Sequence, residues 1–258
     1  MRTMKITAFN CSPRMGSSNT DKIIGPLLEG AREAGAEVET LYVRKLKIAP
    51  CTGCMTCWMK TPGVCLQKDD ADMARQKMMD ADIVVLATPI YFFNMTSYMK
   101  NLMERTILPT ALPFLREVNG RFGHPSRFPD RTLDVLLVAN AGFWGEDVFA
   151  PLLHTLERCR EAGVEEDGRE HMHFAGNILV GFGEILQTEP FGHFFEPFFE
   201  ELRAAGGELV EAGEVSRATC EKLAVPLFTY MNMDADQAVQ MANTYFENVI
   251  KHAEETLA

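Results

Sequence analysis

Short apolar runs alternate with amphipathic segments along most of this chain, and that alternation constrains the fold more than any other feature. Strands that alternate with helices form a parallel sheet with helices on both faces. We therefore expect a doubly wound α/β fold with five parallel strands. The runs expected to form these strands are Met4–Asn10, Glu37–Val43, Asp82–Ala87, Leu133–Ala139 and Asn177–Gly183.

The helical segments are indicated by a 3.6-residue apolar period and by capping residues at their ends. The first helix is expected to begin at Ser18 or Asn19 and to end at Gly35. Later helices are expected over Lys68–Ala81, Met95–Thr106, Asp147–Ala162 and Phe191–Ala205.

Two segments interrupt or extend this pattern. Residues 108–131 are rich in Pro, Gly, Phe and Arg, so we expect a long irregular insertion that serves as a lid or a partner contact. Residues 208–258 are mostly helical in pattern, with a break near Pro226. We therefore expect one domain over residues 1–207 and a helical C-terminal extension over residues 208–258.

Composition and charge exclude several classes of partner. The chain has 258 residues, 47% of them hydrophobic, which is enough for a large core. Its net charge of -11 argues against DNA, RNA and anionic membrane surfaces. No apolar run approaches the ~20 residues of a membrane span, and the N-terminus lacks the features of a signal peptide. We expect a cytoplasmic protein.

The segment that joins the first strand to the first helix is suited to a phosphate group. It reads C-S-P-R-M-G-S-S-N-T over residues 11–20. A helix N-terminus offers free N–H groups and a partial positive charge, to which this loop adds hydroxyls and a guanidinium. It has neither the G-K-S/T of a Walker loop nor G-x-G-x-x-G, so a monophosphate fits best. An ordinary polar turn before a capped helix remains the alternative.

Two further loops follow the third and fourth expected strands. Residues 88–94 are aromatic and end in an amide, and residues 140–145 read N-A-G-F-W-G. In a parallel sheet, ligands bind beyond the carboxyl ends of the strands, where the strand order switches. All three loops fall at that edge, which favours one common ligand site.

These motifs resemble a known family. Ser12-Pro13-Arg14 with Ser17-Ser18-Asn19-Thr20 is similar to the FMN-phosphate loop of the flavodoxin-like NADPH-dependent FMN reductases, although Cys11 stands where a glycine is usual. Thr88-Pro89-Ile90-Tyr91, with Ser97, Lys100 and Glu104-Arg105, resembles the second signature of that family, in which Asp is commoner than Glu before the arginine. The resemblance covers roughly the first 185 residues. The chain also has four closely spaced cysteines, at Cys51, Cys54, Cys57 and Cys65, and with these the most similar subgroup is the iron–sulfur flavoproteins. The resemblance implies a flavodoxin-like strand order of 2-1-3-4-5.

The resemblance also assigns the cofactor contacts. Hydride transfer to a flavin needs no general acid or base, so no catalytic side chain is expected. The residues expected to hold the FMN phosphate are Ser12, Arg14, Ser17, Ser18, Asn19 and Thr20. Those expected at the flavin ring are Pro89, Ile90, Tyr91, Phe92, Phe93, Asn94, Asn140, Ala141, Gly142 and Phe143. At least one of the three aromatics at 91–93 is expected to be core instead, because neighbouring side chains point opposite ways.

Four of the seven cysteines form a C-x2-C-x2-C-x7-C pattern, at Cys51, Cys54, Cys57 and Cys65. This pattern is similar to the runs that bind a 4Fe-4S cluster. Structural zinc is less suited to so tight a triplet, and four free thiols remain a third alternative. The two cysteines later in the chain, at positions 159 and 220, are expected to be buried packing residues.

The resemblance implies an oxidoreductase that moves electrons from NAD(P)H through FMN to a small-molecule or protein acceptor. Electrons would leave singly through a cluster, or in pairs to a quinone or another small acceptor. The alternatives are a non-enzymatic electron-transfer flavoprotein that serves a redox partner, and a flavin-free thiol or metal sensor. The apolar face of the helical tail predicts a homo-oligomer, either a dimer or a tetramer.

Overall fold

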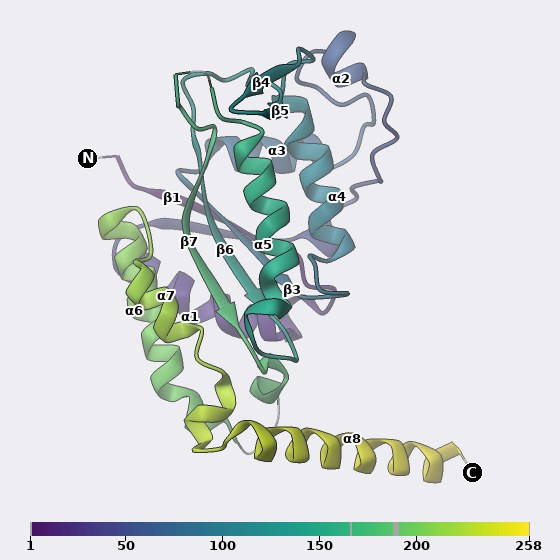
Figure 1. Ribbon diagram of the computed structural model, residues 1–258, viewed down its shortest axis with the longest axis vertical. Helices are drawn as coiled ribbons and strands as arrows, with labels where there is room; N and C mark the ends of the chain where they lie inside the picture. Colours follow the sequence, from purple (N-terminus) through teal and green to yellow (C-terminus); the bar gives the residue numbers. More distant parts are fainter. Residues whose placement is uncertain (1, 166, 188–190, 258) are drawn as a thin grey trace.

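Five parallel strands form the central sheet of the computed structural model, which describes residues 2–165, 167–187 and 191–257 (Figure 1). The strand order is β2-β1-β3-β6-β7, which is the expected 2-1-3-4-5 order counted over this sheet alone. The flavodoxin-like α/β fold is therefore confirmed. The strands are β1 (Lys5–Asn10), β2 (Glu37–Tyr42), β3 (Ile83–Pro89), β6 (Leu133–Asn140) and β7 (Met172–Val180).

The helices cover both faces of this sheet and bury two separate clusters of apolar side chains. One face carries α1 (Asn19–Glu33), α6 (Glu196–Ala212) and α7 (Arg217–Leu223). The other carries α3 (Ala71–Asp80), α4 (Ser97–Thr106) and α5 (Glu146–Glu161). Strand β3 is buried along its whole length, which is why its sequence is continuously apolar.

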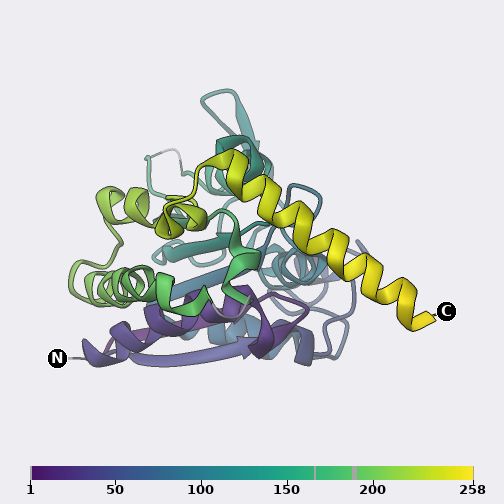
Figure 2. The ribbon, with the colours of Figure 1, turned by 90° about the horizontal axis from the view of Figure 1, so that it is seen from below.

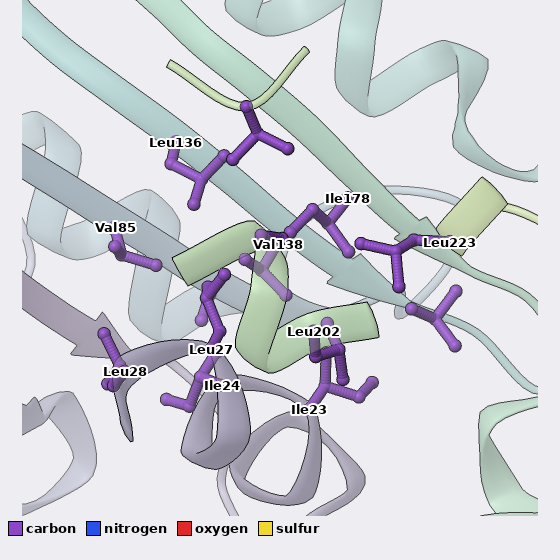
Figure 3. Packing of buried hydrophobic residues seen from close by; sticks show 14 of the residues in the cluster. Ile23, Ile24, Leu27, Leu28, Val85, Leu136, Val138, Ile178, Leu202 and Leu223 are labelled. Atoms are coloured by element: carbon purple, nitrogen blue, oxygen red, sulfur yellow. The ribbon is translucent and has the colours of Figure 1, made fainter. Parts of the chain in front are cut away.

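Two glycines allow α1 and α6 to lie in close contact. A Cβ atom at Gly30 would lie 1.9 Å from the Arg203 carbonyl oxygen, and one at Gly206 would lie 1.9 Å from that of Leu27. Leu27 and Leu202 meet in the same cluster (Figure 3). This packing makes α6 part of the layer that covers the sheet.

The segment 108–131 is more regular than expected. It contains an antiparallel hairpin of β4 (Arg116–Val118) and β5 (Arg121–Gly123) after the short helix η3 (Leu108–Thr110). Asn119 and Gly120 form its turn, with φ angles of 54° and 77°. Asn-Gly is the favoured sequence for a two-residue turn in which both φ angles are positive. The insertion is therefore partly ordered as a short hairpin, where irregular structure was expected throughout.

The fifth strand of the sheet begins earlier than expected, because β7 starts at Met172 and ends at Val180 rather than spanning Asn177–Gly183. Gly176 has a φ of 133° beside an irregularity in the pairing with β6. This bulge breaks the alternation of buried and exposed side chains, so the first half of β7 does not read as a strand.

The C-terminal helix α8 (Ala235–Leu257) extends away from the body in both views (Figures 1 and 2). The boundary expected between residues 207 and 208 falls inside α6, which packs on α1. Within the described residues, no helix is long and apolar enough to cross a membrane. The remaining short helices are η1 (Met15–Ser17), η2 (Val43–Lys45), α2 (Thr56–Met59), η4 (Gly183–Gln187), η5 (Phe191–Phe195) and η6 (Leu227–Met231).

Candidate functional site

Hydrogen bonds join the loops that follow β1, β3 and β6 at the carboxyl edge of the sheet. Ile90 N–H donates to the Asn140 carbonyl at 2.7 Å, which links the β3 and β6 loops. The hydroxyl of Thr96, the N-cap residue of α4, donates to the Cys11 carbonyl at 2.9 Å and links the β1 and β3 loops. The structure therefore brings the three expected loops together.

The N-terminus of α1 is capped from within the first loop. Ser18 Oγ accepts from Asp21 N–H at 3.0 Å and donates to the Met15 carbonyl at 2.6 Å. Ser18 was expected to contact phosphate, and here its hydroxyl also shapes the loop as the helix cap. The backbone N–H groups at the start of α1 are those that a helix leaves without intrahelical partners.

The other hydroxyls of this loop also have partners inside the protein. Ser12 Oγ accepts from Arg14 N–H at 3.3 Å, and Ser17 Oγ donates to the Arg14 carbonyl at 2.9 Å. Thr20 Oγ1 accepts from the Asn140 amide at 2.8 Å. These bonds fix the loop, and each hydroxyl oxygen keeps further hydrogen-bonding capacity.

Asn19 differs from its neighbours. Its side chain is buried, with 1% of the residue exposed, and neither Oδ1 nor Nδ2 has a hydrogen-bond partner in the described part of the chain. An unpaired buried amide costs roughly 1–3 kcal/mol. Asn19 is the first residue of α1, where an anion would be stabilised. A bound ligand at this position would supply the missing partner.

A fourth segment adjoins the phosphate loop. Arg14 lies 3.4 Å from Glu184 in η4, and the Gln187 amide donates to the Ser17 carbonyl at 3.1 Å. Sequence reasoning missed this segment because residues up to 183 were assigned to the last strand. The carboxyl-edge rule would have identified it, since η4 directly follows β7.

Tyr91, Phe92, Phe93 and Asn94 form a strained turn at the surface. Tyr91 and Asn94 exchange backbone hydrogen bonds of 2.9 and 3.1 Å, and the two phenylalanines have φ angles of 50° and 58°. Left-handed backbone at a bulky residue is costly and is concentrated at functional sites.

All three aromatics of this turn are exposed, Phe92 fully, so the expectation that one of them is core was wrong. The side chain of Asn94 is held on the protein side. Its Oδ1 accepts from Met95 N–H at 2.8 Å, and its Nδ2 lies 3.5 Å from Thr155 Oγ1.

The loop after β6 combines a buried start with an exposed tip. Asn140 and Ala141 are buried, whereas Gly142 and Phe143 are exposed. Pro89 is buried and Ile90 half-buried at the end of β3. The buried residues of both loops therefore set the backbone, and the two loops expose four aromatic rings.

The cysteine loop lies between β2 and α3. Cys57 and Cys65 are buried, Cys51 is half-buried and Cys54 is exposed. Burial raises the pKa of Cys57, and the nearby thiols of the other three cysteines raise it further. Within the described residues, however, no three His, Cys, Asp or Glu side chains are grouped closely enough to hold a metal ion.

Arg105 connects this loop to the end of α4. Its buried guanidinium makes a two-point ion pair with Asp69, with both N–O distances at 2.9 Å, and it also donates to the Ala49 carbonyl. Arg105 is nine residues after Thr96, which corresponds to ~14 Å along a helix. The aromatic turn and the cysteine loop therefore lie at opposite ends of α4.

The remaining cysteines have different environments. Cys11 is fully buried, and burial raises the pKa of its thiol. Cys159 is exposed and Cys220 is half-buried, so the expectation of a buried packing role is wrong for Cys159.

The sequence matches proteins of a known family. The family model for NADPH-dependent FMN reductases matches residues 4–124. An iron–sulfur flavoprotein of Methanocaldococcus jannaschii is 35% identical over 201 residues, which cover 72% of this chain and 98% of the relative. An iron–sulfur flavoprotein of Methanosarcina thermophila is 39% identical over 105 residues, or 41% of this chain and 53% of the relative. The chain thus spans about half the length of several of these relatives.

Solved structures share the fold at low sequence identity. An NAD(P)H:quinone oxidoreductase from Methanothermobacter marburgensis superposes with a TM-score of 0.55 at 14% identity, covering 81% of this chain and 98% of that chain. An FMN-dependent NADH-azoreductase from Bacillus anthracis gives 0.54 at 15% identity, covering 80% and 99%. Since one curated relative is matched over nearly its whole length, the chain belongs to the NADPH-dependent FMN reductase family, within its iron–sulfur flavoprotein subgroup.

Proposed function

We propose that this chain binds FMN at the three carboxyl-edge loops and transfers electrons from NAD(P)H to an acceptor. The observation that carries the proposal is the buried, unpartnered amide of Asn19 at the start of α1. Family membership supports the choice of FMN, and the solved azoreductase with this fold was described in complex with FMN.

The phosphate loop fits the FMN phosphate by the chemistry of its donors. Asn19, Ser12 and Ser17 would bind the phosphate together with Ser18, Thr20 and the backbone N–H groups at the α1 N-terminus. Arg14 is exposed, and among the described residues its one ion pair is with the exposed Glu184, so it is available as a countercharge.

The aromatic residues fit the ring of the cofactor. Tyr91, Phe92, Phe93 and Phe143 expose flat apolar surface, and Pro89, Ile90 and Asn94 fix the backbone of the turn that presents it. Asn140, Ala141 and Gly142 would supply backbone and amide groups at the polar edge of the ring. FMN, when bound, supplies the hydride chemistry, while these residues bind the ring, orient it and exclude water.

We propose further that Cys51, Cys54, Cys57 and Cys65 hold a 4Fe-4S cluster. The four thiols lie on one loop, where the other three raise the pKa of Cys57, and the curated relatives are named iron–sulfur flavoproteins. The loop would have to close for all four to meet one cluster. Iron and sulfide content after anaerobic reconstitution tests this, with Cys57→Ser expected to lose the cluster and Cys220→Ser to keep it.

Two proposals concern the protein as a whole. We propose a homo-oligomer, a dimer or a tetramer, because α8 exposes Val239, Phe246 and Val249 at spacings of seven and three residues along one face. We propose a cytoplasmic location, because all seven cysteines are free.

Reconstitution with flavin tests the main proposal. Protein purified without flavin should bind FMN, and riboflavin should bind on the order of a hundredfold more weakly, because it lacks the phosphate that the α1 N-terminus stabilises. The FMN complex should then oxidise NADPH or NADH steadily with a small acceptor and no protein partner. Failure to bind FMN would contradict the proposal. Binding without steady oxidation would identify an electron-transfer module instead of an enzyme.

A further inference from the structure

A cavity lies at the amino-terminal edge of the sheet, far from the loops described above. Its volume is about 250 Å³, and its wall includes Leu133 and Met172, the first residues of β6 and β7. The flavin loops follow the other ends of the strands. Since β6 rises ~3.3 Å per residue over seven steps, the two sites are ~23 Å apart. The cavity is therefore separate from the proposed flavin site.

The wall of this cavity is mainly apolar. It is lined by the ends of α3, α4 and α5 and by the insertion that carries the β4–β5 hairpin, with Met78, Ile107 and Phe128 among the lining residues, and it is open to solvent on one side. A cavity of about 150 Å³ holds one benzene ring, so 250 Å³ suits a molecule with two fused rings.

One polar group in the wall lacks a partner. The Nε atom of Arg131 is buried and makes no hydrogen bond within the described chain. Arg75 and Arg105 also have an unbonded buried Nε, but each forms an ion pair, with Asp72 and Asp69 respectively. Of the described carboxylates, none forms such a pair with Arg131.

The charge of Arg131 is offset by a helix end rather than by an acid. Its Nη2 donates to the carbonyl of Ala81, the C-cap residue of α3. Helix C-termini carry partial negative charge, and the C-terminus of α5 also reaches this cavity through Ala162. An anion is disfavoured beside these two helix ends, so a neutral oxygen acceptor is the better partner for Nε.

The other polar residues in the wall are held by the protein. His171 Nε2 lies 2.5 Å from Glu165 Oε1, and its Nδ1 lies 3.3 Å from the Arg131 carbonyl. His124 packs against Trp58 at a tilt of 52°, with ring centroids 4.6 Å apart, and Trp58 directly follows Cys57. The cavity therefore adjoins the cysteine loop. Arg131 Nε is the polar group in its wall that remains available to bind a ligand.

We propose that this cavity binds a small aromatic or alicyclic carbonyl compound, with its ring among the apolar side chains and its carbonyl oxygen accepting from Arg131 Nε. The exposed thiol of Cys159 lines the cavity, so an occupant would shield that thiol from reagents.

Calorimetric titration of the FMN-loaded protein with 2-acetylnaphthalene tests the proposal. We expect saturable binding to one site per chain and no release of flavin. Alkylation of Cys159 by iodoacetamide, followed by peptide mass spectrometry, should slow at least fivefold at saturation, while alkylation of Cys220 should not change. Replacing Arg131 with lysine, which keeps the charge and removes Nε, should weaken binding on the order of tenfold.

A matched pair of variants at Cys159 keeps the test independent of folding. Cys159→Trp fills the cavity and should abolish binding, whereas Cys159→Ala leaves it open and should bind as the natural protein does. The proposal is overturned if the ketone does not bind, if Cys159→Trp binds it normally, or if Cys159 alkylates at an unchanged rate. Tighter binding of 2-naphthoate than of the ketone would overturn the choice of a neutral acceptor.

Discussion

Asn140 at the end of β6 donates from Nδ2 to Thr20 Oγ1 in α1 at 2.8 Å, across 120 residues of sequence. Both side chains are buried. The bond therefore fixes the loop expected at the flavin ring relative to the loop expected at the phosphate. A ligand that spans both loops therefore meets two loops whose relative positions are already fixed before it binds.

Asn140→Leu is expected to destabilise the protein and to weaken FMN binding together. The substitution leaves the buried Thr20 hydroxyl without its donor, which costs about 1–3 kcal/mol. Urea unfolding of the flavin-free protein measures the first effect, and FMN fluorescence quenching measures the second. Thr20→Ser keeps the acceptor oxygen and serves as the control. An FMN affinity unchanged in Asn140→Leu would show that the two loops need no such link.

Asn19→Leu is expected to separate these two effects. The amide has no partner in the flavin-free protein, so a leucine of similar size should leave the free energy of unfolding unchanged or raise it by about 1 kcal/mol. FMN affinity should fall at least on the order of tenfold, because the ligand loses a buried hydrogen bond. Unfolding and FMN titrations on the same samples check both.

Asn177→Leu is the matched control for this substitution. Asn177 Oδ1 is also buried without a partner, but the residue lies on the edge strand β7, where it pairs with Leu137 of β6. FMN affinity should not change there. A loss of stability in Asn19→Leu without a loss of FMN affinity would assign Asn19 to the fold alone.

Phe92→Asn combined with Phe93→Gly is expected to stabilise the flavin-free protein while impairing the site. Asn-Gly adopts two positive φ angles without the strain that two phenylalanines carry, so stability should rise by about 1–2 kcal/mol. FMN affinity and NADPH oxidation should both fall, because the exposed rings are lost. Phe114→Ala removes an equally exposed ring from the 108–131 insertion and should change neither FMN property. Unchanged FMN affinity in the double variant would show that the turn does not contribute to FMN binding.

Local patterns predicted the elements that depend on neighbouring residues. The run at 82–87 identified β3 because a strand buried on both faces must be apolar throughout. Ser18, the N-cap residue of α1, was one of the two capping candidates placed before the first amphipathic segment, with Asn19 as the other. The Asn119-Gly120 pair is also a local sequence signal, typical of a β-hairpin turn, and it was overlooked in predicting the insertion. These features follow from rules that act over a few residues.

Features that depend on contacts between distant segments were not predictable in this way. The unpaired state of Asn19 depends on every group packed around it, and the place of Glu184 beside Arg14 depends on where β7 ends. The bulge at Gly176 moved that strand by several residues relative to its apolar pattern. Sequence reasoning therefore identified three loops that meet at the carboxyl edge of the sheet and missed the contacts between them.

Arg105→Met is expected to be strongly destabilising. The side chain of Arg105 is 1% exposed and that of its partner Asp69 is 13% exposed. The substitution therefore leaves a largely buried carboxylate without its ion-pair partner. Loss of one partner of such a pair costs about 3–5 kcal/mol. Lys100→Met breaks the exposed pair with Glu104 in the same helix and should cost less than about 0.5 kcal/mol. Equal unfolding free energies for the two variants would contradict this.

The same ion pair predicts a dependence of stability on acid. Burial raises the pKa of Asp69, but hydrogen bonds from Arg105 and from the N–H groups of Ala49 and Ala71 outweigh it, so the pKa lies below its ordinary value of 3.8. The ionised carboxylate therefore contributes its full stability above the unfolded-state pKa, and this contribution is lost as the pH falls through the folded-state value.

The difference in unfolding free energy between the natural protein and Asp69→Asn measures this contribution. It should be constant above about pH 5 and should shrink as the pH falls below about 4, because both forms then carry an uncharged side chain at position 69. Asp167→Asn, which breaks an exposed pair with Arg169, should show a difference near zero throughout. A difference for Asp69→Asn that stays constant down to pH 2 would mean that the loop is held by hydrogen bonds that do not need the charge.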